Sequence, residues 1–179
     1  RHRTRELVTI YCWAKKSRPV TTPSTHPSSE GVQLAVYDYA PTSQKQPVLL
    51  SHATGFHGRV FDPVAEHLHA SHHCYSFDYR GHGDSSLPSD WKANWNGYGD
   101  DALAIARVIA ATQTAAGPII GAGHSMGGAI ALLYTAQYPL DTQSLLLVDS
   151  AGIYKTANTP YLKDPALLKD LMVSKAGDF

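Results

Sequence analysis

The chain has 179 residues, of which 43% are hydrophobic, and its 15 basic and 15 acidic side chains leave a formal net charge of zero. That length and apolar content are typical of a single domain with a sizeable core, and the neutral charge removes any general electrostatic reason to expect nucleic acid or an anionic membrane as a partner. No apolar run approaches the roughly 18 residues that a membrane-spanning helix needs, so we expect a soluble protein without a stable membrane span.

Residues 1–30 differ in composition from the rest of the chain, being basic at first and then rich in Pro, Ser and Thr. Such a segment is predicted to be flexible, although residues 7–13 are a candidate strand. Its Arg-rich, acid-poor beginning is also typical of organelle-targeting peptides. Cys12 and Cys74 are far apart and lack metal-ligand spacing, so we expect free thiols, no metal site and a reducing compartment. The predicted location is therefore cytoplasmic, with organelle targeting as the alternative.

From Gly31 onward, short apolar runs predict strands, and apolar residues at helical spacing predict helices. The predicted strands cover residues 32–39, 48–50, 74–78, 118–122 and 144–148, and the predicted helices begin at Asp62-Pro63, near Ala102 and near Ala129. The buried face of the first helix is expected to carry Phe61, Val64, Ala65 and Leu68.

Strands that alternate with helices favour a mostly parallel central sheet covered on both faces, that is, a three-layer α/β/α sandwich over residues 31–152. Glycine-rich loops follow Leu50, Phe77 and Ala122, the last residues of three apolar runs. Because α/β proteins bind ligands beyond the carboxyl ends of their parallel strands, we expect these loops to converge on one pocket.

Residues 123–128 read Gly-His-Ser-Met-Gly-Gly and lie between a strand candidate and a helix candidate. Gly-x-Ser-x-Gly in this context is typical of a nucleophile elbow, a sharp turn that lifts a serine hydroxyl clear of the sheet. Gly123 and Gly127 would remove side chains that otherwise clash across the turn. Ser125 is therefore the candidate nucleophile, and the amide of Met126 lies at a helix N-terminus, where it can meet an oxyanion. The alternative is an ordinary glycine-rich turn.

With these motifs in place, the chain from about Gly31 onward resembles the α/β-hydrolase superfamily, which includes esterases, lipases and monoacylglycerol lipases. The resemblance rests on motifs that occur in the family's order: a His-Gly-type oxyanion loop at residues 52–55, an Asp-x-Arg-Gly-x-Gly-x-Ser loop at residues 78–85, and the elbow. It implies that the backbone amides of Met126 and Thr54 form the oxyanion hole.

The oxyanion loop departs from the family pattern because Ala53 stands where the family usually has glycine, so the loop must adopt angles that an alanine tolerates. A second register that begins at His57-Gly58 leaves the second oxyanion donor open. Thr54 is preferred because Phe61 then falls at the start of the next helix. The candidate substrate-binding residues are His52, Phe56, His57 and His124. Structural roles are expected of Arg80 and Asp84.

The catalytic triad is incomplete in this sequence. A nucleophilic serine needs a general base and an acid that orients it, and the order in this superfamily is Ser, then Asp or Glu, then His. The chain has 10 histidines, but none follows His124. Asp149 is the candidate acid because it ends the strand after the elbow; alternatively it caps the loop at residues 150–152. The resemblance thus implies a fold truncated after its sixth strand, with residues 153–179 as the start of a cap or lid.

The predicted function is that of a serine hydrolase of the esterase or lipase type, which acts on a small-molecule carboxylic ester through an acyl-enzyme on Ser125. No metal or organic cofactor is needed for this chemistry. Because the base is missing, we expect residues 1–179 to be incomplete and inactive alone. The alternative is a non-catalytic binding protein of the same fold that has lost its base. An apolar strand at residues 144–148 with an uncovered edge favours a longer natural protein, and the sequence leaves the oligomeric state open.

Overall fold

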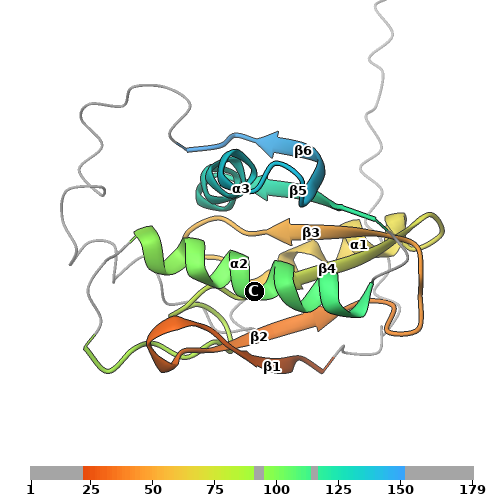
Figure 1. The fold of residues 1–179 in the computed structure, drawn as a ribbon. Helices are drawn as coiled ribbons and strands as arrows, with labels where there is room; N and C mark the ends of the chain where they lie inside the picture. The colour runs from red at the N-terminus through yellow and green to blue at the C-terminus, as the bar shows by residue number, and fades with distance from the viewer. Residues whose placement is uncertain (1–21, 91–94, 114–116, 152–179) are drawn as a thin grey trace, which may run out of the picture.

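A computed structural model describes residues 22–90, 95–113 and 117–151 of the chain. A six-stranded sheet forms its centre, with the strand order β1-β2-β4-β3-β5-β6 (Figure 1). The strands are β1 (Ser24–Pro27), β2 (Gln33–Asp38), β3 (Gln46–Ser51), β4 (His72–Phe77), β5 (Ile119–His124) and β6 (Thr142–Val148). The helices are α1 (Asp62–Leu68), α2 (Trp95–Thr112) and α3 (Met126–Gln137), with 3-10 turns η1 (Ser29–Gly31) and η2 (Gly58–Phe61).

The strands β4, β3, β5 and β6 run parallel, and β2 and β1 extend the sheet antiparallel at one edge. Leu50 pairs with Ser76 of β4 on one side and with Ala122 of β5 on the other. These three strands therefore reach their carboxyl ends at the same edge of the sheet. The predicted mostly parallel sheet is confirmed, and the loops that follow these strands begin side by side.

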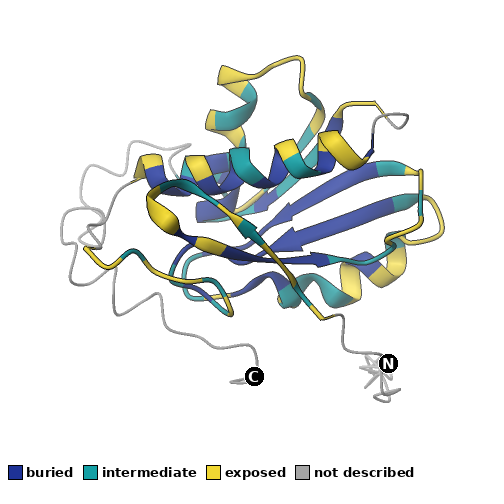
Figure 2. Cartoon of the chain, turned by 60° about the horizontal axis from the view of Figure 1, so that its bottom comes forward, coloured by how far each residue is buried: buried dark blue, intermediate teal, exposed yellow. Residues whose placement is uncertain are grey.

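The side chains of β3 alternate between two hydrophobic clusters on opposite faces of the sheet. Leu49 belongs to the larger cluster, with Ile105 of α2 and Ile130 of α3. Its two neighbours along the chain belong to the smaller cluster, with Ala65 of α1. Because successive side chains of a strand point to opposite faces, α2 and α3 cover one face and α1 covers the other. Figure 2 shows the result: buried strands lie between helices whose exposed residues face outward. The predicted three-layer sandwich is confirmed.

The ordered core begins earlier than the predicted boundary at Gly31. β1 pairs antiparallel with β2, so part of the segment predicted to be flexible belongs to the sheet. Ser28 Oγ donates to Asp101 at 2.6 Å, and Arg80 binds Glu30 at 2.6 Å. Pattern analysis missed β1 because its sequence, Ser-Thr-His-Pro, has no apolar alternation. Long-range pairing and buried charge hold this strand in place instead.

Two predictions lie outside the described residues: the candidate strand at residues 7–13 and the beginning of a cap at residues 153–179.

α1 begins at the predicted Asp62-Pro63, since proline suits the first turn of a helix. Phe61 and Leu68 pack against the smaller cluster as expected. The prediction is wrong for Val64, which is 43% exposed. α1 has only 7 residues, so its buried face is narrow and one apolar side chain is left outside it.

β6 forms the other edge of the sheet and pairs with β5 alone in the part of the chain that the structure describes. Leu146 and Val148 of this strand are 60% and 46% exposed, and Leu133 of α3 is also 60% exposed. Unpaired N–H and C=O groups along such an edge can template further strand pairing. Among the described residues, β6 is thus an edge strand that carries exposed apolar side chains. No helix within residues 22–90, 95–113 and 117–151 combines the length and apolar content needed to cross a membrane.

Candidate active site

Ser125 lies on the sharp turn between β5 and α3. Its backbone angles are φ 51° and ψ −114°, a combination that residues with side chains rarely adopt. The N–H of Ser125 donates to Val148 O at 3.0 Å, and its carbonyl accepts from the N–H groups of Ala129 and Ala151 at 3.1 and 3.0 Å. The strand–turn–helix context predicted for Ser125 is confirmed, and its backbone is held from both sides.

Glycine is required on both sides of Ser125 for steric reasons. A Cβ at Gly123 would lie 2.5 Å from Gly128 Cα, and a Cβ at Gly127 would lie 2.3 Å from the carbonyl oxygen of Ser51. Both contacts are with backbone atoms, which cannot rotate away as a flexible side chain does. The elbow therefore fits closely against the end of β3.

Gly127→Ala is expected to lower the free energy of unfolding by about 1–3 kcal/mol, the usual cost of forcing extra atoms into a packed site. Denaturant unfolding measures the effect. Gly99→Ala is the matched control, because an added Cβ at Gly99 in α2 meets nothing within 4 Å. Alanine there should stabilise the helix by up to about 1 kcal/mol. Equal stabilities for Gly127→Ala and the wild type would contradict the packing argument.

The loop after β3 lies against the first turn of α3. Gly127 N–H donates to His52 O at 3.1 Å, and Thr54 Oγ1 donates to Met126 Sδ at 3.2 Å. Met126 is the first residue of α3, so its N–H belongs to the turn whose amides have no partner within the helix. Thr54 and Met126 are thus direct neighbours next to Ser125. Their role as oxyanion-hole donors stays a prediction.

Ala53 fits the oxyanion loop without backbone strain. Positive φ falls on Gly55, at 79°, and not on Ala53, which is 5% exposed. Phe56 N–H closes the turn by donating to Ala53 O at 3.2 Å. The conformational freedom of glycine is therefore used two residues after the position where the family pattern has it.

The rings of Phe56 and His124 are in edge-to-face contact, with centroids 6.5 Å apart. Phe56 comes from the loop after β3 and is 40% exposed, whereas His124 is the last residue of β5. Two of the residues predicted to contact substrate therefore contact each other, and His124 directly precedes Ser125 in the chain. His57 is only 7% exposed and immediately precedes η2, so little of its side chain faces a ligand.

The His52 side chain is buried and hydrogen-bonded at both ring nitrogens, which contradicts its predicted contact with substrate. Its side chain is 0% exposed, with Nδ1 2.7 Å from Ala53 O and Nε2 accepting from Tyr79 N–H at 3.1 Å. Burial lowers the pKa of the imidazole to about 3, and the neighbouring His82 adds to the effect. A neutral ring with both nitrogens occupied cannot take a proton from Ser125.

The other buried histidines are also occupied away from the nucleophile. His82 Nδ1 lies 3.1 Å from Arg80 O, and burial lowers the pKa of His82 to about 4. His73 lies at the beginning of β4, at the opposite end of the parallel strands from the elbow. Its Nε2 lies 2.6 Å from Asp38. Within the described residues, no hydrogen bond joins a histidine to the Ser125 side chain.

Asp149 directly follows β6, at the same sheet edge as Ser125, because Val148 pairs with His124. It is exposed and has a φ of 44°. Its carboxylate forms no hydrogen bond or ion pair with any other described residue. The role of Asp149 as triad acid stays a prediction, and its exposure and positive φ suit the loop-forming alternative equally well.

Buried polar contacts hold the loop after β4. Asp78 is 0% exposed and accepts from Gly58 N–H, Asp84 N–H and the Tyr37 hydroxyl. Burial raises the pKa of the Asp78 carboxyl, while the two N–H donors act in the opposite direction. Asp84 thus contributes its backbone to the loop, in agreement with its predicted structural role.

Arg80 is 2% exposed, and its guanidinium donates to Asp101 at 3.0 and 2.8 Å and to Glu30. This agrees with the structural role predicted for Arg80. The sequence analysis missed Asp101, because nothing local to α2 distinguishes it from its exposed neighbour Asp100.

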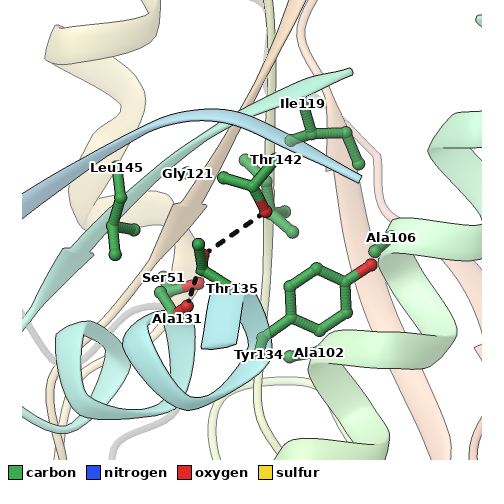
Figure 3. A pocket seen from close by; sticks show the side chains of 11 residues that line it. Ser51, Ala102, Ala106, Ile119, Gly121, Ala131, Tyr134, Thr135, Thr142 and Leu145 are labelled. Carbon is green, nitrogen blue, oxygen red and sulfur yellow. Dashed lines mark hydrogen bonds between the residues drawn. The ribbon is translucent and has the colours of Figure 1, made fainter. Parts of the chain in front are cut away.

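Three cavities near the helices lie away from the nucleophile, and two of them border α3 most closely. The smaller of these two, of about 30 Å³, lies between the sheet and α3, where Thr135 Oγ1 donates to Ala131 O at 2.9 Å and lies 3.3 Å from Thr142 Oγ1 (Figure 3). The larger, of about 400 Å³, opens between α2 and α3. Neither is lined by Ser125 or by any residue of the loop after β3. No group of three or more His, Cys, Asp or Glu side chains suited to a metal ion occurs in the described part of the chain.

Comparison with known protein families gives an independent result. The sequence profile of the family described as serine aminopeptidase, S33, matches residues 42–176. The chain is 33% identical over 138 residues both to Lipase 3 of Moraxella sp. (strain TA144) and to Lipase 1 of Psychrobacter immobilis. Each match covers 75% of this chain and 41% of the relative, so the chain spans less than half the length of these lipases.

Comparison with solved structures agrees with the sequence matches. A crystal structure described as that of a lipase from Acinetobacter baumannii AYE is 36% identical, with a TM-score of 0.66 over 87% of this chain and 50% of that chain. A membrane phospholipase A is 25% identical, with a TM-score of 0.65 over 80% of this chain and 44% of that chain. The shared fold extends over most of this chain in both comparisons.

Proposed function

Because the chain belongs to the serine aminopeptidase S33 family within the α/β-hydrolase superfamily, we propose that it is part of a serine hydrolase that cleaves small-molecule carboxylic esters. The observation that carries the proposal is the strained turn at Ser125, which packs directly against the loop that contains Thr54. The relatives named as lipases supply the ester class.

In the proposed reaction, Ser125 Oγ gives its proton to the general base and forms a bond to the ester carbonyl carbon, whose oxygen takes up the negative charge; the base then returns that proton to the departing alcohol. The amides of Met126 and Thr54 donate to that oxyanion, and one such donor typically contributes about 10²–10³ in kcat. The alcohol leaves with a proton as the ester C–O bond breaks. Water then hydrolyses the acyl-enzyme and releases the acid.

The general base of this reaction is proposed to come from outside residues 1–179. No histidine follows the elbow in this sequence, and the described histidines do not bind Ser125. The acid that would orient this base is proposed to be Asp149 or a residue that, like the base, lies outside residues 1–179. One observation favours a second candidate function, a binding protein of the same fold: the nucleophile has no base within the described residues.

Hydrolysis of a short p-nitrophenyl ester tests the proposed function. The whole protein that contains this chain is expected to turn over the ester with an initial burst and to carry an acyl adduct on Ser125 by mass spectrometry. Residues 1–179 alone are expected to show little or no turnover. Ordinary esterase rates for residues 1–179 alone would contradict the missing-base argument. A folded whole protein with neither turnover nor adduct would instead support the binding protein.

A further inference from the structure

The His52 side chain makes a hydrogen bond at each ring nitrogen, and the two bonds join separate loops. Nε2 lies 3.1 Å from the backbone N of Tyr79, in the loop after β4. Nδ1 lies 2.7 Å from Ala53 O, in the loop after β3. The ring is completely buried between these loops, in contact with the rings of Tyr79 and His82 at centroid distances of 5.1 and 5.0 Å.

The partners of His52 determine which nitrogen carries the proton. A backbone N–H can only donate, so Nε2 must accept from Tyr79. A carbonyl can only accept, so Nδ1 must carry the hydrogen that bonds Ala53 O. The ionisable neighbours that lower the pKa of His52 are His82 and His57, both of which disfavour a second positive charge beside it. Together with burial, they keep the ring neutral at ordinary pH, in the tautomer with hydrogen on Nδ1.

The Ala53 carbonyl belongs to the same peptide group as the Thr54 N–H. A trans peptide group is planar, so the direction of its C=O determines the direction of its N–H. His52 Nδ1–H and Phe56 N–H both donate to Ala53 O, at 2.7 and 3.2 Å. Accepting hydrogen bonds at the oxygen also polarises the peptide and makes its N–H a stronger donor.

We propose that His52 is a positioning residue that links Tyr79 N–H, its own imidazole and the Ala53–Thr54 peptide into one relay, which aims and polarises the Thr54 N–H toward the oxyanion. The catalytic part of this inference rests on the proposed function, whereas the relay itself is independent of it. A second contact supports the placement: the His52 carbonyl accepts from Gly127 N–H at 3.1 Å. The same residue therefore fixes the oxyanion loop against the elbow through its backbone and orients the donor through its side chain.

Two isosteric variants separate the two ends of the relay. His52→Asn keeps an amide N–H near the position of Nδ1, and His52→Gln keeps an acceptor near the position of Nε2. In the whole protein that contains this chain, we expect His52→Gln to lower kcat for a p-nitrophenyl ester by about 10–100-fold with KM changed by less than about threefold, because the lost orientation matters chiefly in the transition state. His52→Asn should retain more of the wild-type kcat than His52→Gln. Equal kcat for both variants and the wild type would overturn the relay.

NMR of the protein supplies a readout that does not depend on catalysis. The His52 ring should show a protonated Nδ1 and an unprotonated Nε2 across the neutral range, and the Thr54 amide resonance should move more in His52→Gln than in His52→Asn. Hydrogen on Nε2, or an unmoved Thr54 resonance in both variants, would overturn the inference. His73→Gln is the control for loss of a buried histidine far from the site, and it should leave the Thr54 resonance in place. If the wild type cleaves no ester while these resonances behave as expected, the proposed function fails and the relay stands.

Discussion

Ser125→Ala is expected to lower kcat for ester hydrolysis by about 10⁶-fold in the whole protein, the scale at which serine hydrolases lose activity when the nucleophile is removed. The substitution keeps the Cβ and removes only the hydroxyl that forms the acyl-enzyme. The turn should persist, because Val148, Ala129 and Ala151 bind the backbone of residue 125 and not its side chain. The measurement is kcat together with covalent labelling by a fluorophosphonate probe.

Ser150→Ala is the matched control for Ser125→Ala. Ser150 lies close to the elbow, where its Oγ approaches the position that a Cβ at Gly128 would occupy. Labelling should persist in Ser150→Ala and disappear in Ser125→Ala. Labelling of a folded Ser125→Ala protein, by contrast, would assign the nucleophile to another residue and remove the basis of the proposed reaction.

Asp101→Ala is expected to lower the free energy of unfolding by about 3–5 kcal/mol, the usual effect of removing one partner from a buried ion pair. Arg80 is 2% exposed, and Asp101 is 0% exposed. The carboxylate accepts from the guanidinium at 3.0 and 2.8 Å, from Arg80 N–H at 3.0 Å and from Ser28 Oγ at 2.6 Å. Removal of the Asp101 carboxylate leaves the buried Arg80 guanidinium with Glu30 as its anionic partner. The Glu30 side chain is far more exposed than that of Arg80 and therefore compensates less.

Asp100→Ala provides the comparison for Asp101→Ala on the same helix. Asp100 is exposed, so its replacement should change the free energy of unfolding by less than about 0.5 kcal/mol. Denaturant unfolding of both variants gives the difference directly. Similar stabilities for the two variants would show that Arg80 reaches water or another anion when Asp101 is absent.

Much of the sheet could be predicted from sequence, because each parallel strand is an apolar run bounded by turn residues. The sequence prediction failed for elements that lack this pattern. β1 has a polar sequence and is held by pairing with β2, and the short helix α1 leaves Val64 exposed. Sequence periodicity reports the preference of a segment, whereas burial also depends on how much surface its neighbours cover.

The candidate site divides in the same way. Ser125, with Gly123 and Gly127 around it, was predictable because the steric demands of a sharp turn act within a few residues. His52 was predicted to face the substrate and instead lies buried. Its actual partner, Tyr79 N–H, is 27 residues away, so no local pattern indicates the contact.

The sequence by itself determined the order of strands and helices from β2 onward, the elbow at Ser125 and the absence of a later histidine from these 179 residues. Only the tertiary structure decided that Arg80 pairs with Asp101 and that His52 joins two loops. The physical reason is that apolar periodicity and turn sterics are local properties of the chain. A buried polar group, in contrast, must find a hydrogen-bond partner among whichever segments folding brings beside it.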